Sequence, residues 1–154
     1  MSLTYSQALT VVNGIHRHAD TLHIRVSAVV VDSGGFVVAA GRMDGAPPLS
    51  SQVAEAKATG AAVWQRSGEQ LVDLQQDRPA FFQAASSFVR LPVIPSLGSV
   101  LVRDGERVIG AVGVSGGSPQ QDVECADAGL RSALELVDGV QSTNSHHSEH
   151  RSAR

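Results

Sequence analysis

Three charged side chains in the first half of the sequence could work together in acid, base or electrostatic chemistry. Arg42 and Asp44 are two positions apart where an apolar run ends, so an extended backbone directs both to one side. Lys57 lies in an alanine-rich segment with helical spacing. Asp44 could act as the acid or base, with Arg42 or Lys57 stabilising negative charge. The alternatives are an Arg42–Asp44 ion pair and a boundary lysine whose ammonium reaches solvent.

A glycine turn between an apolar run and a capped helix is the second candidate. Gly116 and Gly117 free the backbone to turn sharply, and Ser118 and Gln121 have the spacing of a capping box. Amides at such a helix start carry partial positive charge, which suits a carboxylate or phosphate. The alternative is a tight connection without a ligand.

Histidines in and near the first apolar-periodic segment could bind a metal. His16 borders the apolar stripe, whereas His18 lies off it and His23 follows its end. A neutral imidazole at His16 could ligate a haem iron or another transition metal if a cavity opens beside it. The alternative is a helix histidine with no ligand.

The elements that must position these residues follow from hydrophobic periodicity and turn signals. Apolar spacing predicts a helix from Tyr5 to Leu22, with Thr4 and Gln7 forming a capping box. The remaining expected elements are a hairpin of strands 27–32 and 36–40, a helix capped by Ser50 or Ser51 that runs to about Arg66, one or two helical pieces over 68–88 broken by Pro79, a hairpin of strands 99–103 and 108–114, and a last helix that ends near Gly139.

This order of elements is not the strict alternation of a parallel α/β fold. It favours an α+β fold, an α/β/α sandwich in which helices flank an antiparallel sheet. We expect one domain over residues 1–140, followed by a disordered polar tail over 141–154.

Composition excludes several classes of function. A net charge of −3 and an aromatic content of 4% disfavour nucleic-acid binding. The apolar runs are too short to span a membrane, and the N-terminus lacks the pattern of a secretory signal, so we expect a cytoplasmic protein with no membrane partner. Cys125 is the single cysteine and falls within the last helix, which makes it a weak nucleophile. P-loop, zinc-protease and nucleophile-elbow motifs are absent from the sequence.

Three separated blocks of the sequence form a recognisable pattern: VVVDSGGFVVAAGRMDGAP at 29–47, VAEAKATGAA at 53–62 and IGAVGVSGGSPQQDVECADAGL at 109–130. Together they resemble the GlcG/HbpS family, often labelled haem-degrading, which also includes the C-terminal domain of PduO-type proteins. The resemblance implies a profilin-like fold with a central sheet of about five strands, and homo-oligomers from dimers to octamers. The matching positions are Asp32, Gly35, Arg42, Asp44, Gly45, Lys57, Gly113, Ser115, Gly116, Gly117, Asp122, Cys125 and Ala126.

For function, the resemblance implies a haem-binding or other tetrapyrrole-binding protein. In that hypothesis His16 ligates the metal, Arg42 or Lys57 meets the propionates, and the Gly116–Gly117 turn lines the pocket. A different hypothesis is an enzyme, a lyase, isomerase or cyclase acting on a small carbonyl-containing metabolite through Asp44, Lys57 and Arg42. It is favoured by the segment 95–101, PSLGSVL, where family members usually carry Gly-Gly-x-Pro-[IL]. A third hypothesis is a structural or regulatory oligomer without a ligand.

Overall fold

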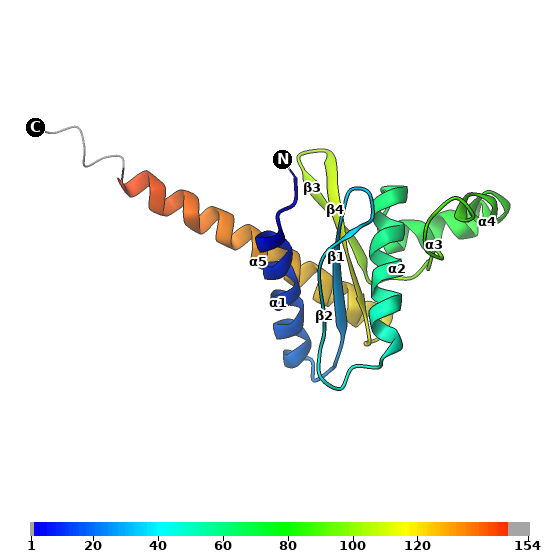
Figure 1. Cartoon of the computed structure of the whole chain (residues 1–154), viewed down its shortest axis with the longest axis horizontal. Coiled ribbons are helices and arrows are strands. Elements are labelled where there is room, and N and C mark those ends of the chain that lie inside the picture. Colours follow the sequence, from blue (N-terminus) through cyan, green and yellow to red (C-terminus); the bar gives the residue numbers. More distant parts are fainter. Residues whose placement is uncertain (1, 148–154) are drawn as a thin grey trace, which may run out of the picture.

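The computed structural model describes the backbone of residues 2–147 and the side chains of residues 2–134. A sheet lies at its centre, with helices on both faces and an arm of two short helices at one side (Figure 1). The elements are α1 Tyr5–Thr21, β1 Ser27–Asp32, β2 Val37–Arg42, α2 Leu49–Trp64, α3 Gly68–Asp77, α4 Pro79–Ser86, β3 Ser99–Asp104, β4 Arg107–Ser115 and α5 Pro119–His147.

The sheet is antiparallel throughout, with strand order β2-β1-β4-β3. Both predicted hairpins are confirmed, and β1 and β4 pair to form the centre. Within the described residues the sheet has four strands, so the expectation of about five was wrong. The segment before β3 contains Pro92 and Pro95, which lack the amide hydrogen that a strand needs for pairing. The likeness to profilin stays a prediction.

Alternation along the central strands divides the core into two layers. On β1, Ala28 and Val30 pack with α1 and α5, whereas Val29 and Val31 pack against α2. Gly113 lets α2 lie directly on β4, because a Cβ at this position would be 2.1 Å from the Ala54 carbonyl oxygen. The α+β class and the helix layers on both sides of the sheet are therefore confirmed.

Two of the three predicted helix starts are confirmed. Thr4 and Gln7 form the capping box of α1, and Ser118 and Gln121 exchange the same pair of hydrogen bonds before α5. The prediction that Ser50 or Ser51 caps α2 was wrong, because α2 starts after Pro48 without a side-chain cap. The Ser50 hydroxyl instead donates to the Pro47 carbonyl at 2.6 Å and lies 2.8 Å from the Ser27 hydroxyl.

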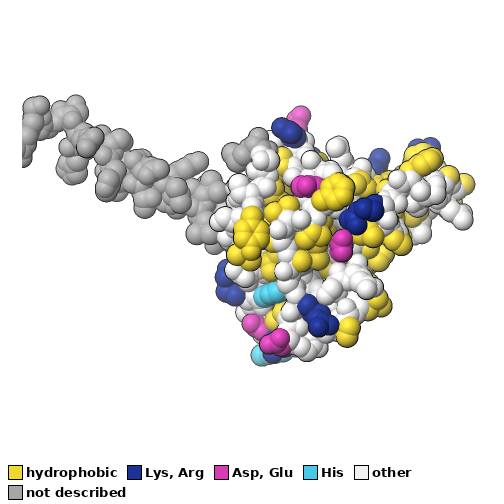
Figure 2. Space-filling view, in the orientation of Figure 1, with side chains coloured by type: hydrophobic (Ala, Val, Ile, Leu, Met, Phe, Trp, Pro, Cys, Tyr) yellow, Lys and Arg dark blue, Asp and Glu magenta, His cyan; other side chains and the backbone are white. Residues whose placement is uncertain are grey.

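Helices α3 and α4 form an arm that points away from the sheet. The predicted break at Pro79 is confirmed, with Pro79 as the first residue of α4. The arm has its own small core of Leu71, Leu74 and Phe82, and it carries apolar side chains at its surface (Figure 2).

The last helix extends well beyond the rest of the molecule (Figure 1). Its predicted end near Gly139 was wrong, because α5 continues to His147. Glycine disfavours a helix interior by only about 1 kcal/mol and ends a helix mainly where a left-handed cap forms. The predicted domain over 1–140 and disordered tail over 141–154 stay predictions: α5 includes positions 141–147, and residues 148–154 lie outside the described residues. No helix in the described part of the chain combines the length and apolarity needed to cross a bilayer.

Candidate functional site

A half-open apolar cavity of about 430 Å³ lies where the start of α1, the β3–β4 hairpin and α5 meet. We call it the hairpin cavity. Gly110 of β4 lies close to β1, because a Cβ there would be 2.4 Å from the Val31 carbonyl oxygen and 3.1 Å from Leu3 Cδ2. The described residues that line the cavity are Leu3, Gln7, Val11, Leu101, Val102, Arg103, Asp104, Ile109, Leu130, Ala133 and Leu134. No motif in the sequence predicts this cavity, since its walls come from four separate segments.

The polar groups of the hairpin cavity lie on α1 and at the end of β3. The Gln7 side-chain oxygen accepts a hydrogen bond from the Thr4 amide at 2.9 Å, as part of the capping box. Arg103 is exposed and donates from Nη1 to the Glu106 carbonyl at 3.0 Å. The hydrogen bond to Glu106 fixes one edge of the Arg103 guanidinium. The Arg103 cation therefore lies beside the apolar wall of the hairpin cavity.

His16 lies on a different side of α1 and faces β2. Its Nε2 atom is 3.1 Å from the Gly41 carbonyl oxygen, and a Cβ at Gly41 would come within 2.8 Å of the ring. Burial lowers the pKa of His16, outweighing the opposing effects of the Gly41 hydrogen bond and of Asp20. The neutral ring suits a metal, but its Nε2 atom is bonded to the strand. His16 is not among the residues that line the hairpin cavity.

Lys57 is buried and forms an ion pair with a residue that the sequence analysis did not select as its partner. The ammonium donates to Asp122 Oδ2 at 3.1 Å and to the Val114 carbonyl at 3.0 Å. The two charged side chains are 5% and 4% exposed. Burial raises the pKa of the Asp122 carboxyl, although Lys57 and the Gly117 amide oppose that rise. Both of these hydrogen bonds of the Lys57 ammonium are internal to the protein, and its role toward a ligand stays a prediction.

The glycine turn completes this buried cluster. The Gly117 amide donates to Asp122 Oδ1 at 2.8 Å, so the structure does bring Lys57 and Gly117 together, through one carboxylate. Gly116 has φ +132°, and a Cβ there would be 2.4 Å from the Arg25 carbonyl oxygen. The turn therefore packs against the backbone of Arg25 and Val26, just before β1, and uses one of its amides internally. A lysine within a buried alanine-rich helix was the signal that could have predicted a buried carboxylate partner.

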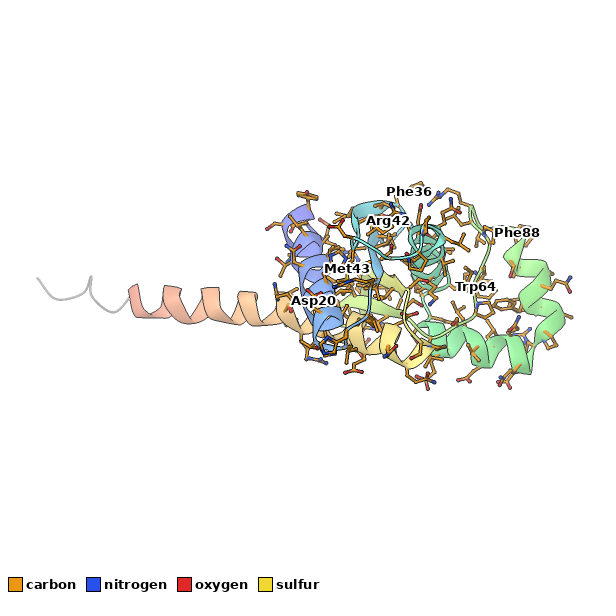
Figure 3. The ribbon with its side chains drawn as sticks, turned by 90° about the horizontal axis from the view of Figure 1, so that it is seen from below. Asp20, Phe36, Arg42, Met43, Trp64 and Phe88 are labelled. Carbon is orange, nitrogen blue, oxygen red and sulfur yellow. The ribbon has the colours of Figure 1, made fainter. Side chains whose placement is uncertain are left out.

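Arg42 lies at the exposed end of β2 (Figure 3). Asp44 is exposed in the loop that follows. Arg42 is the register partner of Ser27, which pairs on its other side with Ser115. The Lys57 ammonium donates to the Val114 carbonyl and to Asp122, and neither Arg42 nor Asp44 is among its hydrogen-bond partners within the described residues. The structure thus does not bring the three residues of the enzyme hypothesis together.

Two other features bear on possible ligands. Within the described residues, no group of three or more His, Cys, Asp or Glu side chains could hold a metal ion. A shallower hollow of about 320 Å³ lies between the end of α2 and the arm, beside Trp64 (Figure 3). Trp64 already contacts Phe81 and Phe82, with ring centroids 6.4 and 5.2 Å away. These aromatic side chains therefore pack the arm against the end of α2.

Comparisons of the sequence and of the structure with known proteins identify relatives of the same family. The GlcG protein of Escherichia coli K12 is 31% identical over 115 residues, which are 73% of this chain and 81% of GlcG. The corrinoid adenosyltransferase PduO of Citrobacter freundii is 28% identical over 130 residues; the match covers 84% of this chain but only 38% of PduO. A crystal structure of a PduOC:heme complex has a TM-score of 0.77 and 25% identity, and the match covers 86% of this chain and 95% of that chain.

The family model described as "Haem degrading protein HbpS-like" matches residues 3–131. That range includes every strand of the sheet and the first part of α5. The resemblance seen in the three sequence blocks is confirmed, and the chain belongs to the HbpS-like family.

Proposed function

We propose that this protein binds a tetrapyrrole ring in the hairpin cavity. The observation that carries the proposal is the cavity itself, which combines an apolar wall with two charged residues at its edge, the Arg103 cation and the neighbouring Asp104. Membership of the HbpS-like family supports it, as does the similarity to a domain whose structure is a complex with heme. The adenosyltransferase activity named for PduO belongs to a protein much longer than this chain, so it forms no part of the proposal.

The size and chemistry of the hairpin cavity fit the organic part of such a ligand. Its volume of about 430 Å³ lies in the range of about 300–1,000 Å³ that is typical of small-molecule sites. A flat apolar ring would remove Ile109, Leu130 and Leu134 from water, which favours binding by roughly 25 cal/mol for each Å² buried. Arg103 could pair with a carboxylate at the ring's edge through a charge-assisted hydrogen bond.

The donor set around the cavity does not fit the metal of a haem. Among the described lining residues, the polar side chains are the Gln7 amide, the Arg103 guanidinium and the Asp104 carboxylate. Protein ligands of haem iron are imidazole, thiolate, thioether or phenolate groups. We therefore derive no reaction at the metal, and the proposal is one of binding.

A titration with hemin tests the proposal. Leu134 lines the cavity and Leu49 lies at the start of α2, and both are 64% exposed, so they form a matched pair. Leu134→Glu should weaken hemin binding by at least about tenfold, because it places a carboxylate against an apolar ring. Leu49→Glu should leave the affinity unchanged. The readout is the saturable change of the Soret band.

Two results would overturn the proposal. One is a Soret band that does not change at stoichiometric hemin. The other is equal affinity of the Leu134→Glu and Leu49→Glu variants, which would place the ligand outside the hairpin cavity. Val102→Trp, which fills the cavity from β3, provides a second variant of different chemistry, and it should weaken binding to a similar extent.

A further inference from the structure

Imidazole, thiol, thioether and phenol groups are the side chains that ligate haem iron, and among the described side chains none of them lines the hairpin cavity: they are His16, His18, His23, Met43, Cys125 and Tyr5. His16 Nε2 is bonded to the Gly41 carbonyl on the β2 side of α1. His18 Nε2 is 2.9 Å from a Glu124 oxygen. Met43 Sδ accepts a hydrogen bond from the Val26 amide at 3.4 Å. Met43 directly follows β2, which is the edge strand opposite β3.

The remaining thiol is also unsuited to the role. Cys125 is fully buried in the core between α1 and α5, and it is not among the residues that line the cavity. Burial, with smaller effects of Asp122 and Glu124, raises its pKa to about 11. A thiolate is the form that ligates a metal, so this side chain is kept in the non-ligating form.

The polar side chains that do line the cavity are poor partners for a porphyrin-bound metal. A guanidinium has no lone pair to offer. The Gln7 oxygen already accepts the Thr4 amide in the capping box, and moving it would expose the start of α1. Carboxylates such as Asp104 suit magnesium, calcium or manganese better than an iron porphyrin.

We infer that the hairpin cavity recognises the tetrapyrrole ring and its carboxylate and is indifferent to the central metal. This inference rests on the proposed function and defines the ligand class more closely, as porphyrins with or without a metal. Apolar contact with the ring and the Arg103 cation act equally on both forms. Binding therefore needs no protein ligand to the metal.

The test compares hemin, zinc protoporphyrin and metal-free protoporphyrin IX in equilibrium titrations of the full chain, followed by absorbance and porphyrin fluorescence. We expect the three Kd values to agree within about threefold, since a lost axial bond would change affinity far more than that. Leu134→Glu should weaken all three alike. His16→Ala and His18→Ala should leave the three affinities and the Soret position of bound hemin unchanged.

The inference is overturned if protoporphyrin IX binds at least about tenfold more weakly than hemin. It is also overturned if His16→Ala or His18→Ala weakens hemin alone or moves its Soret band. Absence of binding by all three compounds would be a different result, because it would remove the proposed function itself. Binding of all three that Leu134→Glu does not weaken would overturn the assignment to the hairpin cavity.

Discussion

Asp122 accepts a hydrogen bond on each carboxylate oxygen, one from the Lys57 ammonium at 3.1 Å and one from the Gly117 amide at 2.8 Å. One buried side chain thereby joins α2 to the turn that starts α5. Lys57 also donates to the Val114 carbonyl, so β4 is part of the same unit. One charge pair thus fixes α2 to β4 and α5, two elements that follow one another directly much later in the sequence.

Removing one partner of this pair should destabilise the fold strongly. Lys57→Met leaves Asp122 charged or protonated in a site without a cation, which we expect to lower the free energy of unfolding by about 3–5 kcal/mol. Urea denaturation followed by circular dichroism measures it. The double variant Lys57→Met with Asp122→Asn retains an acceptor for Gly117 and should lose less than the sum of the single variants. Strict additivity would contradict a direct interaction.

Stability should depend on pH through His16. Its folded-state pKa lies below the ordinary value of 6.5, mainly because of burial, so folding favours the neutral ring. This contribution to stability is fully present above pH 6.5 and is lost as the pH falls through the lower folded-state pKa. The wild type should therefore lose more stability than His16→Gln between pH 7.5 and about pH 5.

Urea denaturation at the two pH values measures this difference. His23→Asn is the matched control, because His23 is exposed and has φ +56°, a conformation that asparagine tolerates. A wild type and a His16→Gln variant whose unfolding energies change in parallel with pH would contradict the assignment to His16.

Gly98 should be far less tolerant of a side chain than Gly105. Both have positive φ, +117° and +60°, but a Cβ at Gly98 would lie 2.8 Å from both Lys57 Nζ and the Val114 carbonyl oxygen. Nothing lies within 4 Å of a Cβ at Gly105. We expect Gly98→Ala to cost about 2–4 kcal/mol and Gly105→Ala about 1 kcal/mol in thermal or urea unfolding. Similar costs at both positions would show that backbone conformation alone matters.

Cys125 should be unreactive while the protein is folded. With a pKa of about 11, only about one thiol in a thousand is ionised at pH 8, and the sulfur is also buried. Labelling with a thiol reagent should therefore follow the rate of unfolding and become rapid in denaturant. Rapid stoichiometric labelling of the native protein would contradict the burial of this side chain.

Arg103 should contribute to porphyrin affinity through a ligand carboxylate. Arg103→Gln should weaken hemin binding by about three- to tenfold, as the loss of one partly exposed charge-assisted hydrogen bond. Arg107→Gln, at an exposed position of the same hairpin that does not line the cavity, is the control. With hemin dimethyl ester, the wild type and Arg103→Gln should bind alike. A difference that persists with the ester would show that Arg103 acts on the cavity wall instead.

The predictable part of the fold is the part that local sequence determines. The capping boxes of Thr4 and Ser118, the break at Pro79 and both hairpin turns depend on residues within a few positions of one another. Ser50 shows the limit of such reasoning. Its hydroxyl has the right chemistry for a helix cap, but it lies against Ser27, which the sequence places 23 positions earlier.

The candidate site was less predictable, because it depends on contacts between distant segments. The sequence indicated Lys57 as a candidate cation, but its partner Asp122 is 65 positions away. Both side chains are buried, and they form an ion pair inside the protein. The hairpin cavity has no motif in the sequence, since leucines and valines that line a cavity have the same periodicity as those that fill a core. Only the packing of α1, α5 and the hairpin distinguishes the two.

The pairing of β1 with β4 affects when the hairpin cavity can form. Val30 lies opposite Val112, so the centre of the sheet joins segments about 80 residues apart and closes late relative to the local hairpins. During synthesis one edge of the valine-rich strand β1 stays unpaired until β4 has been made. The β3–β4 hairpin that covers this edge also supplies a wall of the hairpin cavity. Closing the sheet therefore also puts one wall of the hairpin cavity in place, and a nascent or truncated chain that lacks β4 has neither the closed sheet nor that wall.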